Sequence, residues 1–127
     1  MPLASGLLTG KLKADSKFGA DDHRGFNRHG ESFDRGETFS GVDYEIGLQA
    51  VEELCALIPA SMSLTQFALR WILMFDAVTC AIPGAKSPSQ AEENMGASDL
   101  PALSNEIMFK VREIYSTRIR ELVHHYW

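Results

Sequence analysis

The chain has 127 residues, enough for one domain with a modest hydrophobic core. Apolar residues make up 45% and charged residues 23% of it, which is ordinary for a globular protein. The formal net charge of −5 argues against nucleic acid or an anionic membrane as a partner, and no apolar run approaches the ~18 residues of a membrane span.

Residues 1–43 are rich in glycine and charge and have few apolar residues in series. A long segment without a periodic pattern is usually functional or disordered. Asp22, His23 and His29 lie in it, but no helical spacing or cysteine partner supports a metal site. The first residues, MPLASGLLTGK, lack the layout of a secretion signal, so a cytoplasmic location is expected.

Residues 44–127 predict the order helix, helix, strand, helix, helix within a single partial domain. Apolar residues recur at helical spacing from Tyr44 to Ile58, with Asp43 as the N-cap and Pro59 as the stop. Ser63 and Gln66 then have the spacing of a capping box. The helix that follows, residues 64–75, is apolar on nearly every face, which is typical of a buried helix.

Residues 77–83, AVTCAIP, are short, apolar and partly β-branched, and we predict a buried strand there. Ser87 and Pro88 mark the start of a helix expected to end at Gly96, and Ser104 caps the last helix. One strand cannot form a sheet, because its edges would expose unpaired backbone groups. The pattern therefore resembles the end of an α/β protein.

Two cysteines, Cys55 and Cys80, lie in apolar segments. We expect both to be buried thiols in a reducing compartment.

The turn before Ser87 has the composition of a small anion site. A helix that starts there leaves its first N–H groups unpaired, Gly84 permits a tight turn, and Lys86 adds a positive charge. Most turns between a strand and a helix hold no ligand, so this signal is weak by itself.

Three stretches taken together resemble the aldo-keto reductase family: PLASGLLTGK, SLTQFALRWIL and AIPGAKSPSQAEEN. The stretch DDHRGFNRHGESFDRGETFSGV resembles the bacterial branch related to the potassium-channel β subunits. The resemblance implies a (β/α)8 TIM barrel that reduces aldehydes and ketones with NADPH. This chain would be the C-terminal part of that α/β barrel, mainly helical in isolation with one or two short strands.

The resemblance also implies a cofactor site made of two groups of residues. The group after the seventh barrel strand, in the cofactor-side loop region 1–43, would lie along the pyrophosphate: Leu3, Ser5, Gly6 and Lys11. The group at the eighth barrel helix would bind the adenosine end: Gly84, Lys86, Gln90, Glu93 and Asn94.

Within the second group, Lys86 and Gln90 would face the 2′-phosphate, and Glu93 and Asn94 the adenine edge. Many family members have arginine where Gln90 stands. Arg24 or Arg28 could supply the missing charge, and no motif decides between them.

The family's catalytic aspartate, tyrosine, lysine and histidine lie on early strands, and the resemblance matches none of them here. We therefore expect a chain that carries half of an NADPH site and is inactive alone. The alternatives are an interaction module and a non-functional truncated gene product. Because the helix at 64–75 is so apolar, a homodimer or higher oligomer is also expected.

Overall fold

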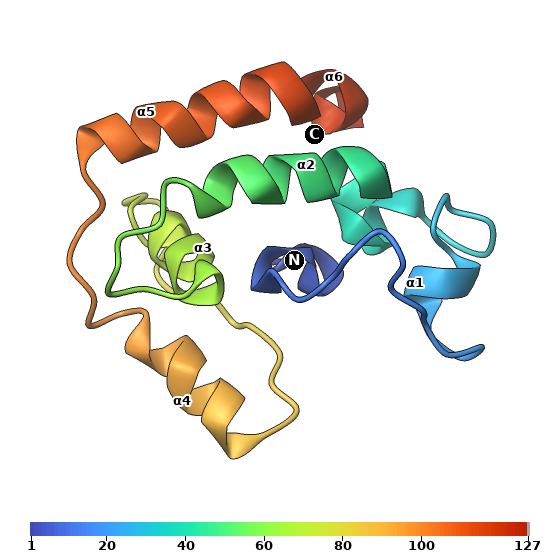
Figure 1. Cartoon of the computed structure of the whole chain (residues 1–127), viewed down its shortest axis with the longest axis horizontal. Helices are drawn as coiled ribbons and strands as arrows, with labels where there is room; N and C mark the ends of the chain where they lie inside the picture. The colour runs from blue at the N-terminus through green and yellow to red at the C-terminus, as the bar shows by residue number, and fades with distance from the viewer. Residues whose placement is uncertain (127) are drawn as a thin grey trace.

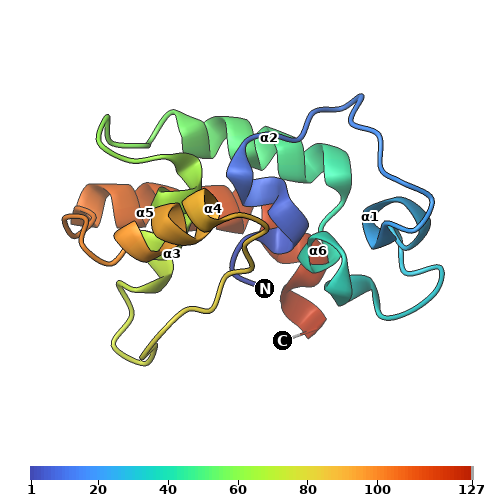
Figure 2. The same cartoon turned by 90° about the horizontal axis from the view of Figure 1, so that it is seen from below.

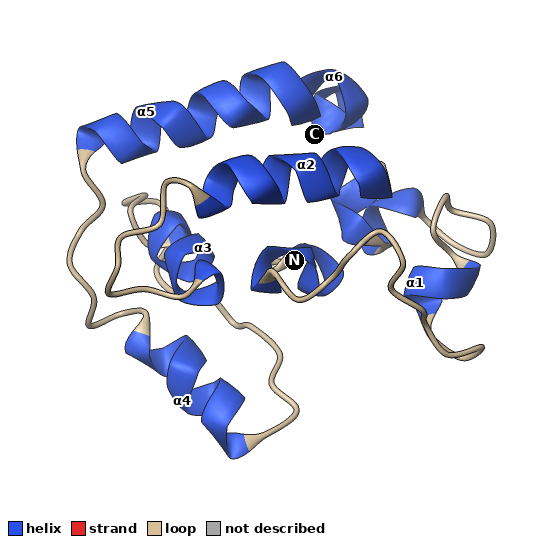
Figure 3. Ribbon diagram, viewed as in Figure 1, coloured by secondary structure: helices blue, strands red, loops and turns tan. Residues whose placement is uncertain are grey.

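The computed structural model describes residues 1–126, and all regular structure within them is helical (Figures 1 and 3). No helix in this described part is long and apolar enough to cross a membrane. The helices and helical turns, in chain order, are η1 (Ala4–Thr9), α1 (His23–Phe26), η2 (Arg35–Glu37), η3 (Phe39–Gly41), α2 (Tyr44–Cys55), α3 (Leu64–Ile72), α4 (Pro88–Gly96), α5 (Asn105–Ile114), the π-turn η4 (Tyr115–Ile119), α6 (Arg120–Val123) and η5 (His124–Tyr126).

The prediction of a mainly helical chain is confirmed, and the predicted strand at residues 77–83 is wrong. These residues form turns and irregular backbone, with the side chain of Ile82 84% exposed. A strand needs a neighbour to pair its N–H and C=O groups, and residues 1–126 provide no second strand. The expected burial of Cys55 and Cys80 is also wrong, since both thiols are exposed.

The predicted helix starts are confirmed because side chains satisfy the first N–H groups. Asp43 accepts hydrogen bonds from the N–H groups of Glu45 and Ile46 at 3.0 and 3.3 Å. Ser63 and Gln66 form the full capping box at the start of α3.

The two later helices are capped by serine, as predicted. Ser87 accepts from the N–H of Gln90, and Ser104 accepts from the N–H of Ile107, both at 3.3 Å. The helix ends are predicted less well: α2 stops at Cys55, before Pro59, and α3 stops at Ile72 rather than residue 75.

The helices α2 and α5 lie side by side and run in opposite directions, and they contact each other (Figure 1). The turn η1 lies beneath them, in contact with both α2 and α3 (Figure 2). Helix α3 also contacts α4. This arrangement puts α3 between the two parts of the chain that the sequence assigns to the cofactor.

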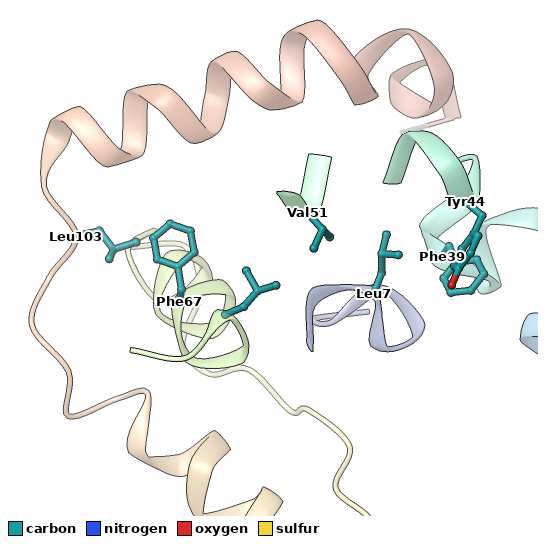
Figure 4. Packing of buried hydrophobic residues seen from close by; sticks show 7 residues of the cluster. Leu7, Phe39, Tyr44, Val51, Phe67 and Leu103 are labelled. Atoms are coloured by element: carbon teal, nitrogen blue, oxygen red, sulfur yellow. The ribbon is translucent and has the colours of Figure 1, made fainter. Parts of the chain in front are cut away.

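The hydrophobic core joins η1, η3, α2 and α3. Figure 4 shows Leu7 and Val51 between Phe39 and Tyr44 on one side and Phe67 and Leu103 on the other. The ring centroids of Phe39 and Tyr44 are 4.9 Å apart. Gly47 lets α2 approach η1 closely, because a Cβ at this position would lie 2.7 Å from Leu7 Cδ2. The buried core residues are Leu7, Phe39, Tyr44, Val51, Leu64, Phe67 and Leu103.

The glycine-rich segment before α2 is held by one fully buried amide. Asn27 Oδ1 accepts from the N–H groups of Ser32 and Phe33 at 2.8 and 2.9 Å, and its Nδ2 donates to Thr38 Oγ1 at 3.1 Å. A buried amide with both ends bonded stabilises one local conformation. The segment is therefore folded around Asn27 although it has no hydrophobic periodicity.

An ion pair at the start of α1 adds to this order. Arg24 Nη2 lies 2.6 Å from Asp22 Oδ2, and Arg24 Nε donates to Asp22 Oδ1 at 2.9 Å. The side-chain hydrogen bonds from Arg24 lower the pKa of Asp22 from 3.8 to about 2. The same bonds raise the pKa of Arg24.

We expect Asp22→Asn to lower the free energy of unfolding at neutral pH by ~1 kcal/mol, because it removes the ion pair with Arg24 while leaving an amide oxygen that can still cap α1. Because the pKa of Asp22 is lower in the folded state than in the unfolded state, its ionised carboxylate stabilises the fold above pH 4. This stabilisation is lost as the pH falls to about 2. The difference between the variant and the wild type, measured by urea unfolding, should therefore vanish across that interval.

Asp21→Asn is the matched control, because Asp21 is exposed and makes no ion pair with residues 1–126. Equal, pH-independent losses in the two variants would contradict the assigned role of Asp22.

Candidate functional site

The residues assigned to the cofactor lie in two places, one on η1 and one around the start of α4. Leu3 precedes η1, Ser5 and Gly6 lie in it, and Lys11 follows it. The second group lies in the turn before α4 and in the helix itself. Helix α3, which contacts both η1 and α4, connects the two groups (Figure 1).

The backbone of η1 is left-handed at its centre, with φ of 55° at Ser5 and 90° at Gly6. The hydroxyl of Ser5 accepts from the N–H of Phe39 at 3.0 Å and donates to the carbonyl of Glu37 at 3.4 Å. It therefore links η1 to η3. Its part in the structure is to hold these two turns together.

Arg24 lies against this part of η1. Its Nη1 donates to the carbonyl of Ser5 at 3.4 Å, and a Cβ on Gly6 would lie 3.5 Å from the same atom. Arg28 instead lies over the rings of Phe18 and Tyr44. The sequence leaves open which arginine supplies charge to the second group, and among residues 1–126 neither makes a hydrogen bond or ion pair with that group. The guanidinium of Arg24 reaches the first group instead. It does so while paired with Asp22.

The start of α4 presents positive charge to solvent. Ser87 caps the helix, Pro88 is its first residue, and Lys86 precedes the cap. Lys86 is exposed, and its ammonium makes no ion pair with any residue from 1 to 126. A helix N-terminus beside an unpaired ammonium favours an anion.

The other members of the second group are bonded within the chain. Gln90 Oε1 accepts from the N–H of Lys86 at 2.7 Å, which tightens the turn. Asn94 Nδ2 donates to the carbonyl of Gly84 at 3.3 Å. These bonds close residues 84–94 into a compact loop and helix start.

Gly84 is not required for the turn itself. Its φ is not in the left-handed region, and a Cβ built on it meets no atom of residues 1–126 within 4 Å.

Glu93 is oriented toward α3. Ser63 Oγ donates to Glu93 Oε1 at 2.6 Å, and Gln66 Nε2 donates to the carbonyl of Glu93 at 3.3 Å. The capping box of α3 thus also holds α4 in place. The sequence identifies Ser63 as a cap but gives no sign of this bond, because the two residues are far apart along the chain.

Metal binding has no support in the described residues. Among residues 1–126, no three His, Cys, Asp or Glu side chains lie close enough to share an ion. Asp22, the carboxylate that the sequence places beside two histidines, is paired with Arg24.

The chain matches known proteins along most of its length. It is 29% identical over 123 residues to the "Probable voltage-gated potassium channel subunit beta" of Oryza sativa subsp. japonica, and 28% identical over 123 residues to the protein of the same description from Arabidopsis thaliana. Each match covers 92% of this chain and 34% of the relative, so the chain spans about a third of the length of these relatives. A sequence model of the Aldo/keto reductase family matches residues 1–116. The chain therefore belongs to the aldo-keto reductase family.

Proposed function

We propose that this chain carries the adenosine-phosphate half of an NADPH site and does not reduce carbonyl compounds by itself. The observation that carries the proposal is the exposed, unpaired Lys86 beside the capped start of α4 in a member of the aldo-keto reductase family. None of the family's four catalytic groups is matched in residues 1–127.

The residues at the start of α4 fit one end of the cofactor better than the other. The ammonium of Lys86 and the first N–H groups of α4 would hold the 2′-phosphate, with Gln90 keeping the turn in shape through its bond to the backbone of Lys86. At the adenine end, Asn94 keeps its Oδ1 available among the bonds formed by residues 1–126. Glu93 accepts from Ser63 through Oε1 alone, so its Oε2, which has no partner among residues 1–126, would be the oxygen that faces the adenine edge.

The cofactor supplies hydride to a carbonyl carbon when it is bound in a complete site. The contribution of this chain would be to bind and orient the adenosine end. Exposed thiols at Cys55 and Cys80, neither in a disulfide, favour a cytoplasmic protein.

We expect NADPH to bind weakly, with a Kd between ~10⁻⁶ and ~10⁻³ M, because the residues of this chain would contact only the adenosine end of the cofactor. Lys86→Glu should weaken binding at least about tenfold, since a carboxylate would repel the 2′-phosphate. Calorimetric titration with NADPH, and with NADH for comparison, measures both effects. The mutation should affect NADPH more than NADH.

Lys17→Glu is the matched control, an exposed lysine with the same change of charge. Equal loss of affinity in both variants would show that only net charge matters, and the assignment of Lys86 would fail.

We also propose that the chain self-associates, through residues 79–85 and α4. The large apolar side chains of α3 are buried or half-buried, so they are not the source of an exposed patch. The exposed apolar side chains here are Ile82, at 84%, and Met95, at 67%. Both line a shallow hollow of about 230 Å³ beside α4.

The backbone of this segment is also available for pairing. From residue 79 to 85, the only backbone group with a hydrogen-bond partner in residues 1–126 is the carbonyl of Gly84. An apolar segment with unpaired N–H and C=O groups is a template for pairing with an identical segment. A two-fold dimer would bury the exposed apolar side chains and pair the free backbone N–H and C=O groups of both copies.

We expect light scattering at micromolar concentrations to show a dimer, and Ile82→Lys to yield a monomer, because a buried lysine charge would oppose the contact. Phe109→Lys, on an exposed apolar residue of α5, should leave the dimer intact. A wild-type monomer at these concentrations, or equal dissociation by both substitutions, would refute this interface.

A further inference from the structure

The space between η1, η3, α2, α3 and the α5–η4 junction is a cavity of about 550 Å³. Its walls are apolar side chains from all of these elements, among them Leu8, Ala50, Val51, Ala68 and Ile119. Leu7 and Val51, which line it, are seen between the helices in Figure 4. Protein interiors have few voids larger than a water molecule, whereas small-molecule sites measure ~300–1,000 Å³. The cavity has the size of a binding site.

Unusual backbone gathers on the wall of this cavity. Ala4, Phe39 and Ser40 line it with φ of 45°, 50° and 56°, a region that residues other than glycine rarely adopt. Tyr115 and Ile119 line it from the π-turn η4. Left-handed residues and π-turns are both found more often at functional sites than elsewhere.

The polar groups on the wall are mainly donors. Trp71 lines the cavity, and its Nε1 is buried with no partner in residues 1–126. Arg112 also lines the cavity and is exposed, and its guanidinium makes no ion pair within the described part of the chain. No Asp or Glu is among the lining residues. A ligand with an apolar body and one negative charge would complement this surface.

We propose that the cavity binds a medium-chain fatty carboxylate. The alkyl chain lies among the apolar residues of η1, α2 and α3, and the carboxylate pairs with Arg112 at the opening. No bond is made or broken. Neither Lys86 nor the start of α4 takes part, so this site is separate from the proposed cofactor site.

The test is a titration with decanoate, below its micellar concentration, that follows the fluorescence of Trp71. A Trp127→Phe background leaves Trp71 as the only indole. We expect saturable binding of one decanoate per chain and binding of 1-decanol at least about fivefold weaker. Ala50→Phe should abolish both by filling the cavity.

Arg112→Gln should lower the affinity for decanoate at least about fivefold and leave that for decanol unchanged. Arg120→Gln, a change at an exposed arginine that does not line the cavity, is the matched control and should change neither. Circular dichroism establishes that each variant is folded. If Ala50→Phe is not folded, Ala68→Leu replaces it in the test, because it fills the same space with a smaller side chain.

Binding that does not saturate, or that survives both cavity-filling variants, would overturn the site. If the cavity-filling variants lose decanoate binding but Arg112→Gln does not, the assignment of an anionic ligand would be overturned. A dimer that the filling variants dissociate would show that a second copy occupies the cavity, and the proposal would fail.

Discussion

The structure depends on one constraint: the apolar faces of α2, α3 and α5 must be covered without a β-sheet in the described residues. Neighbouring helices and the turn η1 cover these faces in place of strands. The turn η1 packs beneath α2, with Gly47 permitting the close approach to Leu7, and α5 lies along the other side of α2. Between these elements the helices leave an apolar cavity of about 550 Å³.

The same constraint connects the core to the start of α4. Helix α3 is buried along one side, and its first residues reach α4 through the bonds of Ser63 and Gln66 to Glu93. The packing of the core therefore helps to position Lys86, together with the hydrogen bonds within its own turn. In the proposed function, this packing would keep Lys86 in place in a chain that spans about a third of the length of its relatives.

Local features of this fold could be predicted from the sequence, and features that need distant partners could not. The caps at Asp43, Ser63, Ser87 and Ser104 depend on residues within one helical turn, and all four are confirmed. The strand at 77–83 is wrong because apolar β-branched composition specifies a strand only where a neighbour pairs with it. The bond between Ser63 and Glu93, the contact of Arg24 with η1 and the buried Asn27 were missed because no periodic pattern marks them. The family was identified because its motifs recur in order from Pro2 to Asn94, and the family model matches residues 1–116.

Hydrogen–deuterium exchange on the intact chain, at a dilution where it is monomeric, tests most directly whether these helices fold together without a sheet. We expect slow exchange in α2, α3 and α5, whose backbone bonds are covered by the core, and fast exchange from residue 79 to 85, where no backbone amide has a partner in residues 1–126. Uniformly fast exchange in the three helices, or protection of residues 79–85 in the monomer, would contradict the helical fold described above.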